Sequence, residues 1–324
     1  MTTDPLAREI TRRESRQSYL VMRLLVDRDL VEDGYRAYAY FRWADDMVDK
    51  YCASAAERID FIRGERQLVQ LLYQGGQPAH LRREEKFLAE LIQHDRGPNS
   101  RLRSYIENFI AVIEFDAERK GRPISGDELE TYTARLATAV TDAIQYFIGN
   151  GYPYLEHPYR TSSARAAHIA HMLRDLRQDL AVGFVNVPTE DQESYRLQLS
   201  DLESPAFRDW VKSRVNLARL ELQRGEEYID SLPILRTQIA AHWYSSHFAH
   251  LLDRIERDDY RLRLDYSDSS ATLEFLGMVG ITLRVTLHHV VRLLTGWGRR
   301  GDARESRRTS KPGGSLVRSG LTGP

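Results

Sequence analysis

The chain has 324 residues, 42% of them hydrophobic, which is enough to bury a sizeable core in one large domain or two. Its formal net charge of −1 excludes a protein that is basic over its whole surface, so we expect no nucleic-acid partner. Cys52 is the only cysteine, which excludes an internal disulfide and a cysteine-based metal site.

The first 13 residues are polar and lack the apolar run of a signal peptide. No stretch approaches the roughly 20 apolar residues of a membrane-spanning helix, so we expect a cytoplasmic protein. Residues 8–32 then contain Ser15, Arg16 and Gln17 ahead of an apolar, helix-compatible stretch. The simpler interpretation of this opening is a serine cap on a solvated helical turn, and the alternative is an anion site built from hydroxyl, arginine and amide donors.

Residues 32–49 predict a helix that carries acidic side chains on one edge. Arg42, Asp45 and Asp49 lie at helical steps of three and four, and apolar side chains lie near the opposite edge. A single Asp-x-x-x-Asp pair is usually a solvated face. Its importance therefore depends on whether the chain supplies a second one.

The middle of the chain predicts further helices at 55–73, 79–94 and 99–119. Ser125 or Asp127 is a plausible cap for the next helix, 128–150, which is apolar on several sides. Small residues in it, including Ala137 and Thr141, leave room for a neighbouring helix or for an elongated ligand, and the sequence alone does not separate these explanations.

A second acidic helix follows a loop at 149–163. In it His168, His171, Asp175 and Asp179 share one edge, and the helix ends within residues 181–188. Two Asp-x-x-x-Asp helices therefore lie about 130 residues apart. If they face each other across a bundle, the four carboxylates repel one another unless a cation binds between them.

Three more helices are predicted at 204–230, 234–258 and 271–297, and nothing marks a second domain, so residues 1–298 form one all-helical domain in this prediction. Residues 299–324 carry seven basic and two acidic side chains. The last helix with this tail could contact a membrane surface peripherally. Core packing with a disordered tail is the simpler interpretation.

Paired Asp-x-x-x-Asp motifs suit Mg²⁺, which prefers carboxylate and water oxygens and bridges to substrate phosphates. Arg42 and Arg174 could then hold phosphate oxygens. The two histidines would instead suit a softer metal. A di-iron bundle needs Glu-x-x-His on two helices, and the sequence contains none, so magnesium is favoured. Such a site ionises an allylic diphosphate, and aromatic walls shield the carbocation from water.

The residues from Asp45 to Asp49 and from His171 to Asp179, followed by Gly183 and residues 186–188, resemble the two signature regions of the squalene/phytoene synthase family. The resemblance spans roughly residues 12–265. It implies an all-α class I isoprenoid synthase bundle around a central cavity, with Mg²⁺-dependent chemistry on C15 or C20 prenyl diphosphates. The metal-binding acids it implies are Asp45, Asp49, Asp175 and Asp179.

The same resemblance implies a diphosphate site, and with the aromatic and small residues of the helices it predicts a substrate cavity. The predicted diphosphate-binding residues are Arg42, Arg174, Ser15, Arg16 and Gln17. The predicted cavity residues are Tyr38, Phe41, Tyr132, Ala137, Thr141, His168, His171 and Phe248.

Four positions depart from the family's pattern. His168 and His171 stand where members commonly carry Gln and Asn, Thr141 replaces a glycine, and Phe248 replaces a tyrosine. The leading hypothesis is head-to-head condensation of two prenyl diphosphates through a cyclopropyl intermediate. The departures motivate a second hypothesis, a terpene synthase that cyclises one prenyl diphosphate. A third is a non-catalytic relative that binds lipid or a protein. The sequence does not decide whether NADPH reduces the product.

Overall fold

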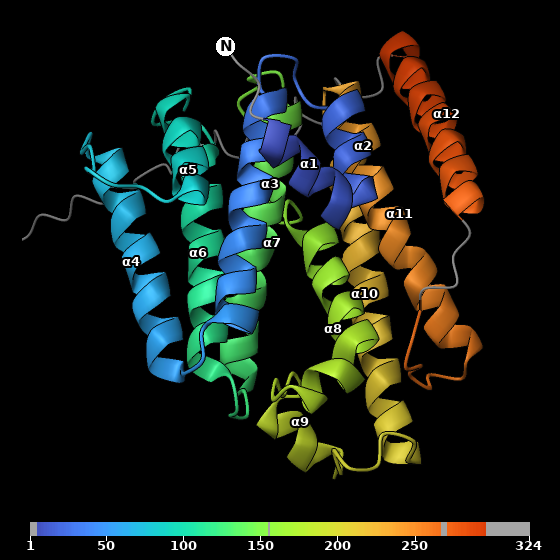
Figure 1. Ribbon diagram of the computed structural model, residues 1–324. Coiled ribbons are helices and arrows are strands. Elements are labelled where there is room, and N and C mark those ends of the chain that lie inside the picture. Colours follow the sequence, from blue (N-terminus) through green and yellow to red (C-terminus); the bar gives the residue numbers. More distant parts are fainter. Residues whose placement is uncertain (1–4, 155, 267–270, 296–324) are drawn as a thin grey trace, which may run out of the picture.

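The computed structural model describes residues 5–154, 156–266 and 271–295, and every regular element in these ranges is a helix (Figure 1). The all-α prediction is therefore confirmed. The elements in chain order are α1 (Pro5–Glu14), α2 (Arg16–Leu24), α3 (Val31–Asp46), η1 (Met47–Tyr51), α4 (Ala55–Tyr73), α5 (Arg83–Gln93), α6 (Leu102–Arg119), α7 (Gly126–Ile148), α8 (Ser162–Ala181), α9 (Thr189–Ser194), α10 (Pro205–Ser231), α11 (Leu235–Arg257) and α12 (Ala271–Thr295). The basic tail at 299–324 lies outside the described residues. No helix in the described part of the chain is long and apolar enough to cross a bilayer.

The long helices run roughly along one common direction and form a bundle (Figure 1). Within it α6 packs against α7, α7 against α8, and α8 against both α10 and α11. Helices α4 and α5 flank α6 and α3 on one outer side, and α12 lies against α11 on the other. The short helix α9 lies at the end of the bundle where α8 finishes (Figure 1).

Serine side chains cap the amino termini of several of these helices, as is usual for N-cap positions. Ser15 accepts from the backbone N–H of Ser18 at the start of α2, and this cap divides the predicted 8–32 stretch into two helices. At α7 the cap is Ser125, which forms a capping box with Glu128. The sequence had left Ser125 and Asp127 open for this position.

The first acidic helix changes its hydrogen-bonding pattern inside the acidic motif. It is α-helical through Asp46 and continues as the π-helical turn Met47–Tyr51, closed by a hydrogen bond from the Cys52 N–H to the Met47 carbonyl. A π-turn holds one more residue per turn than an α-turn and is often found at functional sites. The direction of Asp49 relative to Asp45 therefore differs from that on the uniform α-helix that the sequence predicted.

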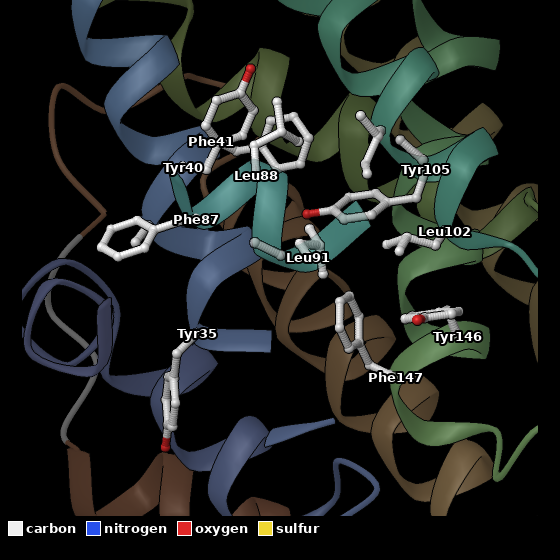
Figure 2. Close-up of a cluster of buried hydrophobic side chains, with 14 of the residues drawn as sticks. Tyr35, Tyr40, Phe41, Phe87, Leu88, Leu91, Leu102, Tyr105, Tyr146 and Phe147 are labelled. Atoms are coloured by element: carbon white, nitrogen blue, oxygen red, sulfur yellow. The ribbon is translucent and has the colours of Figure 1, made fainter. Parts of the chain in front are cut away.

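Two large hydrophobic clusters hold the bundle together. The first joins α1–α6 to α7, α11 and α12 and contains many aromatic rings (Figure 2). In it Phe41 is 4% exposed and contacts the rings of Tyr40, Tyr105 and Phe109. The second cluster joins α8 to α10 and α11 and includes Trp210.

Helices α8 and α10 come unusually close at Gly225. A Cβ atom at this position would lie 2.7 Å from the backbone nitrogen of Ser163, in the first turn of α8. Glycine in the middle of a helix costs about 1 kcal/mol relative to alanine. The close approach of the two backbones is the physical reason for a glycine here.

Candidate functional site

The two acidic motifs lie at the same end of the bundle. Helix α3 and the π-turn reach it with Asp45 and Asp49, and α8 reaches it with Asp175 and Asp179 (Figure 1). The carboxylate of Asp116, near the end of α6, interacts electrostatically with both Asp45 and Asp179. The two motifs therefore border a common region beside the last turn of α6.

The first motif combines paired and unpaired carboxylates. Arg42 lies 2.8 Å from Asp45 and also pairs with Asp46, which Lys50 contacts at 2.8 Å. Burial raises the pKa of Asp45 to about 6, with a further contribution from the nearby Asp49. For Asp46 burial acts in the same direction, but the hydrogen bonds from Arg42 and Lys50 outweigh it and lower the pKa. Burial also raises the pKa of Asp49, so Asp45 and Asp49 are the two acids of this motif whose charged forms are disfavoured.

The second motif also combines an aspartate that is paired with an arginine and an aspartate that is not. Arg174 holds Asp175 with two parallel hydrogen bonds, each 2.6 Å long. Asp179 accepts a 2.7 Å hydrogen bond from the side chain of Asn186, which belongs to the segment after α8. Burial, followed by repulsion from Asp175, still raises the pKa of Asp179 to about 6. Asn186 is therefore a candidate functional residue, although the sequence predicts only that it follows the second acidic helix.

Asp116 is the main site residue that the sequence reasoning missed. It pairs with Arg119 at 2.8 Å, and the hydroxyl of Tyr132 on α7 donates to it at 3.0 Å. Burial raises the pKa of Asp116 although both partners lower it. Asp116 and Arg119 are three residues apart in the sequence, as Arg42 and Asp45 are. This spacing could have identified Asp116, but without a second acidic residue beside it the segment resembles an ordinary helix end.

These acids make the stability of the metal-free protein depend on pH in a defined direction. A carboxyl group whose pKa is raised to about 6 on folding, as for Asp45 and Asp179, stabilises the folded state while protonated. This contribution is complete below the unfolded value of about 4 and is lost as the pH rises through about 6. We expect the Tm of the wild-type protein in EDTA to gain more between about pH 7 and about pH 5 than that of an Asp45→Asn/Asp179→Asn variant, measured by calorimetry. Equal gains would contradict the expectation.

Whether these side chains suit a divalent cation depends on which donor atoms they offer. Within the described ranges, no three Asp, Glu, His or Cys side chains come close enough together to hold a metal ion. Arg42 and Arg174 engage the carboxylates of Asp45 and Asp175 instead. The four predicted ligands nevertheless offer oxygen donors only, and Asp45 and Asp179 experience repulsion that a cation would relieve. This donor chemistry suits a hard cation.

The two histidines of α8 lie in aromatic surroundings. The ring of His168 lies 5.2 Å from that of Tyr132, and the ring of His171 lies 4.6 Å from that of Phe248. Burial lowers the pKa of His168 to about 4 and that of His171 to about 3, so both rings are neutral near pH 7. The buried Nε2 atom of His168 has no hydrogen-bond partner among the described residues. This atom is a candidate for contact with a bound molecule.

The amino-terminal residues of the predicted diphosphate site divide into two kinds. Ser15 caps α2 and also interacts with the hydroxyl of Tyr38, whose pKa is raised by burial and which lies close enough to Arg42 to be influenced by it. Arg16 and Gln17 are exposed in the first turn of α2. Ser15 and Tyr38 therefore connect the start of α2 with the first acidic motif.

A cavity of about 30 Å³ lies between α7, α8, α10 and α11. Thr141 lines it, together with Ser163, whose buried hydroxyl has no hydrogen-bond partner among the residues described. Arg160 and Gln145 form a polar side of the cavity, joined by a 3.2 Å hydrogen bond. Ala137, one turn before Thr141 on α7, is fully buried. Phe41 belongs to the first hydrophobic cluster, where its ring contacts account for its burial.

Comparisons with known proteins point to one family and one fold. A sequence model of the family described as squalene/phytoene synthase matches residues 11–273. A presqualene diphosphate synthase from Zymomonas mobilis subsp. mobilis is 30% identical over 193 residues, which cover 59% of this chain and 62% of that relative. The match thus spans less than two thirds of the relative's own length.

Solved structures show the same fold at low sequence identity. A squalene synthase from Alicyclobacillus acidocaldarius aligns with a TM-score of 0.63 and 20% identity, covering 80% of this chain and 95% of that one. A dehydrosqualene synthase solved with a ligand aligns with a TM-score of 0.66 and 16% identity, covering 88% of this chain and 95% of that one. Both structures support the predicted helical bundle.

Proposed function

The chain belongs to the squalene/phytoene synthase family, and from this premise we propose that it is a Mg²⁺-dependent prenyltransferase. In the proposed reaction two prenyl diphosphates, C15 or C20, condense head to head with release of diphosphate. The observation that carries the proposal is the placement of both acidic motifs around Asp116 at one end of the bundle. The presqualene diphosphate synthase relative supports the same reaction class.

We assign the metal to Asp45, Asp49, Asp175 and Asp179. Mg²⁺ bound there would neutralise the departing diphosphate. Arg42 and Arg174 already lie beside these carboxylates and would turn to the phosphate oxygens, whose geometry matches the guanidinium group. Of the other predicted diphosphate contacts, Ser15 lies nearer this region than the exposed Arg16 and Gln17, through its interaction with Tyr38.

Aromatic side chains would shield the carbocation beside this site. The ring of Tyr132 is tilted against that of His168, the rings of His171 and Phe248 meet edge to face, and both histidines are neutral near pH 7. A neutral ring does not repel a cation, whereas a protonated one would. The low pKa values of the two histidines are therefore compatible with a cationic intermediate.

The direct test uses purified protein with Mg²⁺ and C15 or C20 prenyl diphosphate, each with and without NADPH. We expect Mg²⁺-dependent release of diphosphate and a product with twice the carbon number of the substrate, detected by mass spectrometry. Absence of diphosphate release with every substrate would refute the proposal and would instead favour a non-catalytic relative.

Cyclisation of one prenyl diphosphate is the second candidate. The observation that favours it is the small cavity beside Thr141, at a position where the family resemblance implies a glycine. The threonine side chain, with its hydroxyl and methyl groups, leaves less room for a second prenyl chain than the hydrogen atom of glycine does. Product mass separates the two reactions, because cyclisation preserves the carbon number and condensation doubles it.

Thr141→Gly is expected to shift selectivity towards longer substrates. Removal of the side chain enlarges the cavity between α7 and α11, and steric differences of this size change selectivity by roughly 10- to 200-fold. We expect the ratio of kcat/KM for C20 over C15 diphosphate to rise at least about tenfold. Thr138→Gly is the matched control, because it places the same helix-weakening residue on α7 away from the cavity lining. An equal shift in both variants would contradict a role for Thr141.

A further inference from the structure

The cavity between α7, α8, α10 and α11 has a polar side that is buried deep in the bundle. Most of its lining is apolar, but Gln145, Arg160 and Tyr228 meet there in one hydrogen-bonded group. Each of the three is at most 8% exposed. Buried polar groups cost free energy unless they are hydrogen-bonded. The hydrogen bonds that this group leaves unmade therefore indicate what a molecule in the cavity would bind.

The hydrogen bonds fix which groups are left over. The Arg160 guanidinium donates to the amide oxygen of Gln145 at 3.2 Å. The amide nitrogen of Gln145 therefore faces Tyr228 and donates to its hydroxyl oxygen at 2.7 Å. The proton of the Tyr228 hydroxyl then needs an acceptor, and none lies among the described residues. The buried hydroxyl of Ser163, which also lines the cavity, has no partner there either.

The charges beside the polar side are already balanced. Arg160 lies 2.7 Å from Asp142, which is fully buried, and 3.6 Å from Glu156. Arg101 lies 3.8 Å from the same oxygen of Asp142 and 2.9 Å from Glu156. Two guanidinium groups thus face two carboxylates, so an anionic group in the cavity would meet no uncompensated positive charge. A neutral hydroxyl group, which can both accept and donate, matches the two unused hydroxyls.

The cavity lies on the same edge of α8 as the second acidic motif. Ala164 lines it, and Ala164, His168, His171 and Asp175 follow at steps of four, three and four, which keeps them on one edge of the helix. At 1.5 Å per residue, Ala164 and Asp175 lie about 16 Å apart along the helix axis. An extended C15 prenyl chain spans about 14 Å, since its main chain has about a dozen carbons joined by bonds of about 1.5 Å. A C15 chain whose diphosphate lies beside Asp175 would therefore end at the cavity.

Helix α11 connects the same two regions. Thr237, Ala241 and Tyr244 line the cavity, and Phe248 follows one turn later on the same edge of α11. The rings of Tyr244 and Phe248 lie 5.0 Å apart, and the ring of Phe248 lies 4.6 Å from that of His171. An aromatic path therefore leads from the cavity to the edge of α8 that carries the acidic motif.

The cavity volume of about 30 Å³ suits a small polar group. A water molecule needs roughly 10–15 Å³, so the space holds one or two groups of that size. The methyl groups of an unmodified chain end would leave the hydroxyls of Tyr228 and Ser163 without partners. We propose that the polar side of the cavity binds a hydroxyl group at the far end of the prenyl chain, so that the substrate class is a terminally hydroxylated C15 prenyl diphosphate. This rests on the proposed function, because it takes the diphosphate to lie at the acidic motifs.

The test compares two C15 prenyl thiolodiphosphates, with and without a hydroxyl on a methyl group at the far end. Both resist ionisation, so calorimetry in Mg²⁺ measures binding whether or not the protein turns a substrate over. We expect the hydroxylated analogue to bind the wild type at least about tenfold more tightly, because a site built to bind a hydroxyl group rejects the analogue that lacks it. Tyr228→Phe should reduce this ratio to about one, and Ser163→Ala should lower it several-fold.

Tyr154→Phe is the matched control for Tyr228→Phe. Both tyrosines are 6% exposed, but the hydroxyl of Tyr154 bonds with Thr237 and Tyr154 does not line the cavity. The control should keep the wild-type preference for the hydroxylated analogue. Thermal melts check that all three variants fold, and the wild-type ratio tests the proposal without any variant.

Equal binding of the two analogues to the wild type would overturn the proposal, because water would then satisfy the two hydroxyls in both complexes. Loss of the preference in Tyr154→Phe to the same extent as in Tyr228→Phe would also overturn it, and so would a lack of binding by either analogue. Failure of the proposed function appears separately, as the absence of diphosphate release from prenyl diphosphates while the binding preference is kept.

Discussion

Replacing Asp179 by Asn should lower kcat about 10²- to 10³-fold without lowering the Tm, because a group that stabilises transition-state charge is lost while the packing is kept. Asn has nearly the same shape as Asp and can still accept the hydrogen bond from Asn186. The substitution also removes a carboxylate that Asp175 repels. In EDTA near pH 7 the Tm of the variant should therefore equal or exceed that of the wild type.

Steady-state kinetics across a range of Mg²⁺ concentrations and calorimetry provide the two measurements. Asp209→Asn is the control, because Asp209 is an exposed aspartate of α10 and belongs to neither acidic motif. A variant with full activity would remove Asp179 from the metal site. A variant with a clearly lower Tm would show that the carboxylate has a structural role.

Asp116→Asn should raise the Mg²⁺ concentration needed for half-maximal activity about 10- to 100-fold, the usual effect of residues that support metal ligands. Asp116 acts through its neighbours in this prediction. It holds Arg119 at 2.8 Å and the Tyr132 hydroxyl at 3.0 Å, and it adds negative charge beside Asp45 and Asp179. A purely structural residue would change the Tm but not the Mg²⁺ dependence.

Glu118→Gln is the matched control for this experiment, because Glu118 lies on the same helix and is exposed to solvent. It should leave the Mg²⁺ dependence as in the wild type. If Asp116→Asn lowers activity only in proportion to a loss of folded protein, or if both variants respond alike, the assignment of Asp116 as a positioning residue is wrong.

The helices and the family could be predicted because they depend on local pattern. Apolar residues three and four apart define α3 and α8 regardless of what surrounds them, and the cap candidates Ser125 and Asp127 indicate where α7 begins. The two acidic motifs carry the family resemblance within about a dozen residues each. The all-α fold and the family membership are confirmed by the structure and the comparisons.

Features that depend on tertiary contacts were not accessible in this way. The interaction of Asp116 with both Asp45 and Asp179 depends on how the bundle is packed, and residues 115–119 alone do not indicate it. The sequence predicts an ordinary α-helix where the structure has the π-turn Met47–Tyr51, since side-chain periodicity over five residues does not distinguish a π-turn from an α-helical turn. Helix α9, only six residues long, was missed because so short a segment has little periodicity of its own.

Gly225 bears on how the acid-bearing helix α8 is held in the bundle. Because the backbones of α8 and α10 approach so closely there, a side chain at 225 would require one of these helices to shift, and α8 is the helix that carries Asp175 and Asp179. A residue far from the carboxylates therefore helps to set the position of the helix that carries Asp175 and Asp179. A substitution that enlarges the cavity beside Thr141 is therefore better tolerated on α7 than at the close contact between α8 and α10.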